Sequence, residues 1–160
     1  MMTVRLIVLG KLKESYLRDA CAEYTKRLQA FCRLQVVELT PQRLPENPSS
    51  SQITDALEKE AQEICRQIPQ GAKVFALCIE GKMFSSEQFS ALLDKTAVDG
   101  TGTVVLIIGS SFGLSDSIKQ LAQVRLSMSP MTFPHQLARV MLLEQLYRAF
   151  QISSGGKYHK

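Results

Sequence analysis

Short apolar segments rich in β-branched residues alternate along this chain with longer segments whose apolar residues recur at helical spacing. The short segments predict strands at about 3–9, 33–40, 73–79, 103–108 and 124–128. The longer segments predict helices at about 14–31, 51–68, 85–98, 115–122 and 134–152. Such alternation is typical of βαβ units, in which helices connect parallel strands. We therefore expect an α/β fold with a mostly parallel sheet and helices on both faces.

Local signals refine several of these boundaries. Segment 103–108 is the most strongly β-prone in the chain, which predicts a central parallel strand. Ser85 and Gln88 have the spacing of a capping box, and Ser51 is expected to cap the helix that follows it. A turn at 80–82 is expected to end the third strand.

Composition and length favour a single globular domain over residues 1–160. No repeat, low-complexity tract or linker divides the chain, and no apolar run is long enough to span a membrane. The N-terminal segment lacks the flanks and cleavage site of a secretory signal, so a cytoplasmic protein is expected. A formal net charge of +4 permits a polyanionic partner without requiring one.

The cysteines and histidines do not have the spacing of a metal site. There is no C-x-x-C pair, and the chain contains only two histidines, His135 and His159. No metal is therefore expected. The cysteines are interpreted as reduced thiols in the core, with Cys65 on the inner face of its helix together with Ile53, Leu57, Ala61 and Ile64.

The last predicted helix, with Pro134 at its first position, is apolar over an unusually wide arc. A helix of this kind is buried on more than one side, and a small monomer has few elements to cover it. We therefore expect a symmetric homodimer that packs through this helix. Glu144 and Arg148 lie four residues apart on the helix, so their simplest interpretation is a surface ion pair.

A glycine-containing loop, Gly109–Gly113, directly follows the predicted central strand. Ligands of parallel α/β sheets bind at the carboxyl ends of strands, where glycine lets the backbone approach closely. A dinucleotide-binding loop is disfavoured, because it would follow the first strand and carry three glycines. The segment also matches the G-x-S-x-G elbow of serine hydrolases, with Ser111 as nucleophile and His159 as the histidine in the required order. A tight turn without catalytic function remains the third alternative.

A second loop, from Leu126 to Phe133, joins the fifth strand to the last helix and carries no charged residue. A flat heterocycle could bind there through backbone groups while leucine and methionine side chains pack on its faces. Ser127, Ser129 and Thr132 could contact the polar ends of such a ligand. The alternative is that Met128 and Met131 only fill the core.

Together, several segments resemble the RlmH family, the small SPOUT-class methyltransferases that act on a pseudouridine of large-subunit ribosomal RNA. The similarity covers nearly the whole chain. It is carried by Val8–Lys11, Leu77–Lys82, Ser85–Glu87, Ile108–Gly113, Leu126–Val140, Glu144–Ala149 and Tyr158–Lys160. Two departures lie beside the expected ligand pocket: Ser110 replaces a glycine found in many members, and Cys78 replaces an aspartate.

This resemblance implies a C-terminal trefoil knot, a homodimer and an S-adenosylmethionine site built from the knot loops. The methyl acceptor would be N3 of a pseudouridine in 23S ribosomal RNA, on the large subunit or the whole ribosome. The resemblance places the methyl-donor contacts at Leu77, Gly109, Met128, Ser129, Pro130, Met131, Thr132 and Phe133.

The C-terminal tail, which follows the last predicted helix, supplies two of the three expected catalytic residues. His159 is a candidate for proton transfer or substrate positioning together with Tyr158, and an inert polar end is the alternative. Arg148 and Arg139 could bind phosphates, because a guanidinium can donate two hydrogen bonds to one phosphate. Lys11 and Lys13 could extend an RNA-facing surface. The expected catalytic residues are therefore His159, Tyr158 and Arg148. A small serine hydrolase and a non-catalytic RNA-binding dimer remain the alternative functions.

Overall fold

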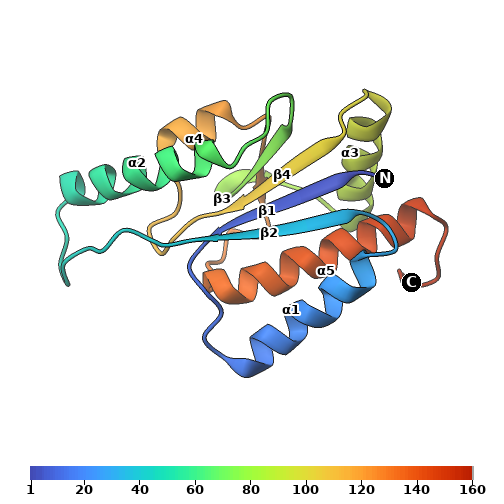
Figure 1. Cartoon of the computed structure of the whole chain (residues 1–160), viewed down its shortest axis with the longest axis horizontal. Coiled ribbons are helices and arrows are strands. Elements are labelled where there is room, and N and C mark those ends of the chain that lie inside the picture. The colour runs from blue at the N-terminus through green and yellow to red at the C-terminus, as the bar shows by residue number, and fades with distance from the viewer. Residues whose placement is uncertain (160) are drawn as a thin grey trace.

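A five-stranded sheet in which all paired neighbours run parallel organises residues 1–159, the part of the chain that the computed structural model describes (Figure 1). The strands are β1 (Thr3–Leu9), β2 (Arg33–Leu39), β3 (Lys73–Met83), β4 (Thr103–Ile108) and β5 (Val124–Ser127). The helices are α1 (Ser15–Leu28), α2 (Ser50–Arg66), α3 (Ser86–Val98), α4 (Asp116–Leu121) and α5 (His135–Ser153). The predicted α/β fold and its element order are confirmed.

The strand order is β2-β1-β4-β3-β5, so β4 is the central strand, as its composition predicted. Residues Val104–Ile108 are all buried, because helices cover both faces of the sheet. Strands buried on both faces are expected to be continuously apolar rather than alternating, and β4 has that character.

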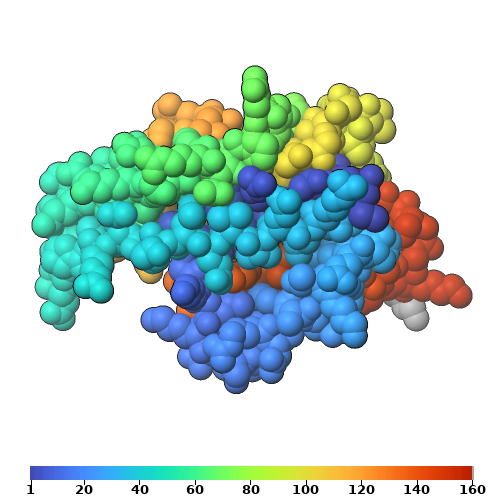
Figure 2. Space-filling view, viewed as in Figure 1, coloured from blue at the N-terminus to red at the C-terminus, as the bar shows by residue number. Residues whose placement is uncertain are grey.

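Two separate cores form on the two faces of the sheet. On one face α1, α3 and α5 pack against alternate residues of the central strands, including Leu6, Phe75 and Leu106. On the other face α2 and α4 pack against the residues between them, such as Ile7 and Ile107. The same division is visible in Figure 1, where α2 and α4 lie on the opposite side of the sheet from α1 and α5. Figure 2 shows the loop before α2 and the start of that helix extending beyond the rest of the molecule on the left.

Strand β3 differs from the prediction at its end. Residues 80–82 do not end the strand, which continues to Met83. Both Leu77 and Lys82 pair with Leu126 of β5, so the residues between them form a bulge. An added Cβ at Gly81 would lie 2.6 Å from the carbonyl oxygen of Arg125, so only glycine fits at this close contact of two backbones.

Three further predictions are corrected by the structure. Ser49, not Ser51, caps α2, because its hydroxyl accepts a hydrogen bond from the amide of Gln52 in a complete capping box. Cys65 is exposed, and Glu60 takes an inward-facing place on the same helix. Pro134 precedes α5 as the capping residue instead of lying in its first turn. The capping box at Ser85 and Gln88 is confirmed, and Cys21, Cys32 and Cys78 are buried as expected.

Helix α5 lies between other parts of the same chain. It packs against α1 on one side and α3 on the other, and Leu142, Leu143 and Leu146 face the sheet. Much of the wide apolar arc is therefore covered within one chain, so this arc does not by itself require a partner.

In residues 1–159 no helix has both the length and the hydropathy needed for a membrane span.

Arg139 is buried inside this packing and does not face solvent. Its side chain is 6% exposed, and it donates hydrogen bonds to Glu38 Oε2 at 2.8 Å and to the carbonyl of Gly10 at 3.1 Å. The guanidinium thus joins α5 to the ends of β1 and β2. The expectation that Arg139 binds a phosphate is wrong, because its donors hold the fold together.

Replacing Arg139 by methionine is expected to lower the free energy of unfolding by about 3 kcal/mol, since a carbonyl and a partly buried carboxylate lose their partner. Urea denaturation measures the change. The matched control is Arg66→Met, which removes an exposed ion pair with Glu63 and should cost less than about 1 kcal/mol. If both variants lost the same free energy of unfolding, the buried contacts of Arg139 would contribute no more to stability than an exposed ion pair.

Candidate functional site

A cavity of about 680 Å³ opens at the carboxyl ends of the parallel strands. Most of its wall comes from the bulge of β3, the loop after β4 and the loop between β5 and α5, and residues of α4 and the start of α5 complete it. We call it the first cavity. The carboxyl end of a parallel sheet is where ligands of α/β proteins bind, and this volume lies within the range of small-molecule sites.

Most of the residues expected to contact a methyl donor line this cavity. They are Leu77, Gly109, Met128, Ser129, Met131, Thr132 and Phe133. Pro130 is exposed and is not part of the lining. The two loops 109–113 and 128–134, which α4 and β5 separate in the sequence, therefore meet at one site, as the sequence predicted. Cys78 and Ser110, the two departures from the family pattern, also line it.

The loop 109–113 folds into a very tight turn. The amide of Gly113 donates to the carbonyl of Ser110 at 2.8 Å, and an added Cβ at Gly109 would lie only 2.3 Å from the carbonyl oxygen of Gly113. Gly113 itself has a φ of +86°, in the left-handed region. The turn is thus stabilised by contact of backbone against backbone.

A buried carboxylate fixes the outer side of this turn. Glu60 of α2 is 4% exposed. It accepts hydrogen bonds from Ser110 Oγ and from the backbone N–H of Gln42, each at 2.8 Å. The serine that departs from the family pattern thereby ties the loop to α2.

The geometry does not favour a serine hydrolase. In a nucleophile elbow the serine lies at the start of a helix, but α4 begins only at Asp116, and Ser111 is exposed within the tight turn. His159 contacts Arg148 and Glu87 instead of Ser111.

Charged groups at the rim of the first cavity are paired or neutral. Lys119 and Glu80 form an ion pair of 2.6 Å, which lowers the pKa of Glu80 and raises that of Lys119. Burial, together with the positive charges of Arg139 and Lys13, lowers the pKa of His135. His135 is therefore a neutral imidazole near pH 7, at the start of α5 beside the cavity.

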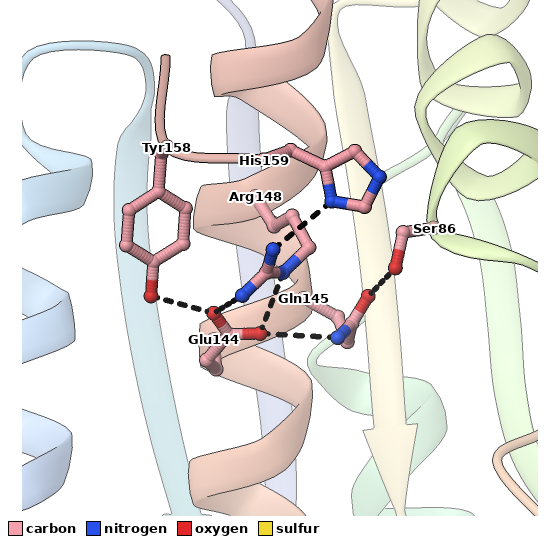
Figure 3. A network of polar contacts seen from close by, with 6 residues as sticks. All are labelled: Ser86, Glu144, Gln145, Arg148, Tyr158 and His159. Atoms are coloured by element: carbon pink, nitrogen blue, oxygen red, sulfur yellow. Dashed lines mark hydrogen bonds and ion pairs between the residues drawn. The ribbon is translucent and has the colours of Figure 1, made fainter. Parts of the chain in front are cut away.

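The C-terminal tail folds back onto α5 and joins a polar network (Figure 3). Glu144 is its centre: it accepts from Nε of Arg148 at 3.2 Å and from a terminal nitrogen of Arg148 at 3.0 Å. It also accepts from the hydroxyl of Tyr158 at 2.8 Å and from the amide of Gln145 at 3.0 Å. The Arg148 guanidinium lies 4.7 Å from the centre of the Tyr158 ring. The expected ion pair of Glu144 and Arg148 exists, but it is partly buried and belongs to this larger network.

Both ring nitrogens of His159 have partners. Nδ1 lies 3.0 Å from Arg148, and Nε2 lies 2.7 Å from Glu87. A guanidinium can only donate, so Nδ1 is the acceptor and Nε2 carries the hydrogen that Glu87 accepts. Burial is the main cause that raises the pKa of Tyr158 above its usual value, and the hydrogen bond to Glu144 is the second cause. Tyr158 is therefore a neutral phenol. The tail is a docked and hydrogen-bonded end of the chain.

Sequence reasoning missed four residues that organise these sites. The sequence alone assigns no role to Glu60, places Glu87 and Gln145 only within segments that resemble the family, and predicts a surface ion pair for Glu144. A signal was present for three of them, because Glu87, Glu144 and Gln145 lie within segments that carry the family resemblance. Lys11 and Lys13 are exposed, as an RNA-facing role requires.

Comparison with known proteins agrees with this geometry. Residues 2–159 match a family model described as a predicted SPOUT methyltransferase. A relative from Clostridium acetobutylicum, named ribosomal RNA large subunit methyltransferase H, is 49% identical over 99% of this chain and 100% of its own length. Proteins of the same name from Leuconostoc mesenteroides and Bacillus pumilus are 48% and 47% identical over the same shares.

A solved structure shares the fold at much lower sequence identity. It is described as a probable methylase family protein from Haemophilus influenzae, is 13% identical, and has a TM-score of 0.55 over 98% of this chain and 70% of that one. The parallel sheet, the two loops that meet at its carboxyl end and the match over 2–159 lead to one conclusion. The chain belongs to the SPOUT methyltransferase family.

Proposed function

We propose that this protein transfers a methyl group from S-adenosylmethionine to N3 of a pseudouridine in 23S ribosomal RNA, on the large subunit or the assembled ribosome. The observation that carries the proposal is the first cavity, where the two expected donor-binding loops meet. Family membership supports methyl transfer, and the names of the relatives support large-subunit ribosomal RNA as the substrate.

The residues of the first cavity fit the donor chemically. Leu77, Met128 and Phe133 offer apolar surfaces for a flat adenine, and the backbone around Gly109 can approach it closely. The neutral imidazole of His135 adds no positive charge beside a cationic sulfonium. The ion pair of Glu80 and Lys119 offers polar contacts at the rim.

When bound, S-adenosylmethionine supplies a methyl group on a sulfonium, and the C–S bond breaks to leave a neutral thioether as the acceptor nitrogen forms its N–C bond. The chain's part is to position the acceptor and to accept the proton that its nitrogen loses. His159 can accept that proton at Nδ1 only after this atom leaves Arg148. Arg148, still held by Glu144 through its other nitrogens, then has a donor available for a phosphate.

RNA contact and subunit association complete the proposal. The exposed Lys11 and Lys13 provide a basic surface, and the net charge of +4 is modest for a protein that recognises an assembled ribosome. The large apolar side chains Ile79, Phe112, Met131 and Leu137 are exposed on the β3 bulge, the two loops and the start of α5. We infer that a second copy covers part of this surface in a homodimer, and that the loops form the trefoil knot of the family.

The direct test is isothermal titration with S-adenosylmethionine, comparing the wild type with Gly109→Ala. An added Cβ at this position has no room, so the loop must move, and we expect donor affinity to fall at least about tenfold, or about 1.4 kcal/mol. Gly102→Ala is the matched control, because an added Cβ there meets no atom within 4 Å. Absence of heat with the wild type would contradict a methyltransferase and leave the non-catalytic RNA-binding dimer.

The role of the tail is tested with His159→Ala and the neighbouring control Lys157→Ala. Loss of a proton acceptor should lower kcat by about a hundredfold on ribosomal substrate, within the usual range for general base catalysis, while donor affinity stays unchanged. The measurement is incorporation of labelled methyl groups under saturating donor. If His159→Ala methylated ribosomes as the wild type does, the tail would be a passive end.

The homodimer is tested by light scattering at micromolar concentration. We expect about twice the 17.8 kDa of one chain, because the exposed apolar side chains favour association. Met131→Asp, which places a charge on a side chain 72% exposed, should shift the mass toward that of one chain. A single-chain mass for the wild type at this concentration would refute the dimer.

A further inference from the structure

A second cavity of about 410 Å³ lies between β5, the start of α3 and the middle of α5. Its walls include the apolar side chains of Phe84, Phe89, Met128 and Met141. Its polar lining comes from Ser85, Ser86, Ser127, Glu144 and Gln145. None of the roles described above uses this space. Aromatic and methionine surfaces with a few polar groups at one edge are well suited to a planar heterocycle.

Met128 belongs to the walls of both cavities. A ligand in the second cavity would therefore lie next to one in the first, separated by a flexible thioether side chain. The polar edge of the second cavity is the network of Figure 3, in which Glu144 and Gln145 connect to Arg148 and the tail. Donor site, second cavity and expected catalytic residues thus form one continuous region.

Gln145 has hydrogen-bonding capacity to spare at this edge. Its Oε1 accepts from the hydroxyl of Ser86 at 2.6 Å, and its amide nitrogen donates to Glu144 at 3.0 Å. Among the contacts of residues 1–159, these leave one amide N–H and one oxygen lone pair. Such a side chain can pair with a neighbouring N–H and C=O on the edge of a base, without giving up its present partners.

A cation stands close to the same cavity. Lys82 is exposed, and its Nζ lies 5.2 Å from the centre of the Phe84 ring, which lines the cavity. A base that packed against the Phe84 ring would lie close to this ammonium group, which can pair with a phosphate. The arrangement therefore fits a base that carries a phosphate.

We propose that the second cavity binds the pyrimidine base of the methyl acceptor, and that Gln145 recognises its N1–H and C2=O groups. The inference rests on the proposed function. Pseudouridine is linked to its ribose through carbon, so its N1 keeps a hydrogen that uridine lacks. When Gln145 pairs with that edge, N3 makes no hydrogen bond to Gln145 and stays free for methylation. Gln145 is then a specificity-determining residue for pseudouridine over uridine.

The first experiment follows the methyl signals of ¹³C-methyl methionine in the wild-type protein by NMR, without donor. Pseudouridine 5′-monophosphate at millimolar concentrations is expected to shift the signals of Met128 and Met141, and uridine 5′-monophosphate to shift them less. Met1, on the exposed N-terminus, is the internal control. Shifts confined to Met131, or equal shifts with both nucleotides, would overturn the assignment.

The second experiment measures methyl transfer and donor affinity for two variants. Met141→Trp fills the second cavity and should reduce transfer at least about a hundredfold, with donor affinity unchanged by titration. Val98→Trp is its control, because this side chain is 85% exposed at the other end of α3. Transfer at the wild-type rate, an equal loss of donor affinity, or a changed molecular mass would each overturn the proposal.

Gln145→Leu keeps the approximate volume and removes the amide, so it tests recognition even if the tryptophan variant fails to fold. On large subunits that carry pseudouridine or uridine at the target position, the wild type should prefer pseudouridine at least about tenfold in kcat/KM, and the variant less than about twofold. Gln120→Leu, on the exposed side of α4, should keep the wild-type ratio. An unchanged ratio in Gln145→Leu refutes the assignment, whereas a wild type that methylates neither substrate refutes the proposed function itself.

Discussion

Contact of backbone against backbone at two glycines holds the functional region together. At Gly109 the end of β4 touches the carbonyl of Gly113, and at Gly81 the end of β3 touches the carbonyl of Arg125, in both cases with no room for a Cβ atom. These contacts fix the tight turn after β4 and the bulge of β3 against β5. Because the first cavity is built from these segments and the loop after β5, its shape depends on the two close approaches.

The two arginines of α5 have different roles because Arg139 is buried and Arg148 is only partly buried. Arg139 faces inward, where its donors are used by Glu38 and Gly10, so it can only stabilise the fold. Arg148 lies nine residues later at the partly exposed edge of the helix, and Glu144 orients its guanidinium. The same helix thus anchors the core with one arginine and holds the tail with the other.

The elements of the fold were predictable because strands buried on both faces are continuously apolar and because capping residues mark helix starts. The exceptions have tertiary causes. The bulge of β3 depends on its pairing with β5, and the inward place of Glu60 depends on Ser110, fifty residues away. The two loops of the first cavity could be anticipated from parallel-sheet topology, but the network around Glu144 could not. It requires the tail to fold back beside α3, which local sequence does not specify.

The most direct test of this account is a crystal structure of the protein with S-adenosylmethionine bound. The account predicts electron density for the adenine in the first cavity, between the loop after β4 and the loop before α5, with the sulfonium methyl directed toward Met128 and the second cavity. Density for the donor elsewhere on the molecule, or a methyl group directed away from Met128, would contradict it.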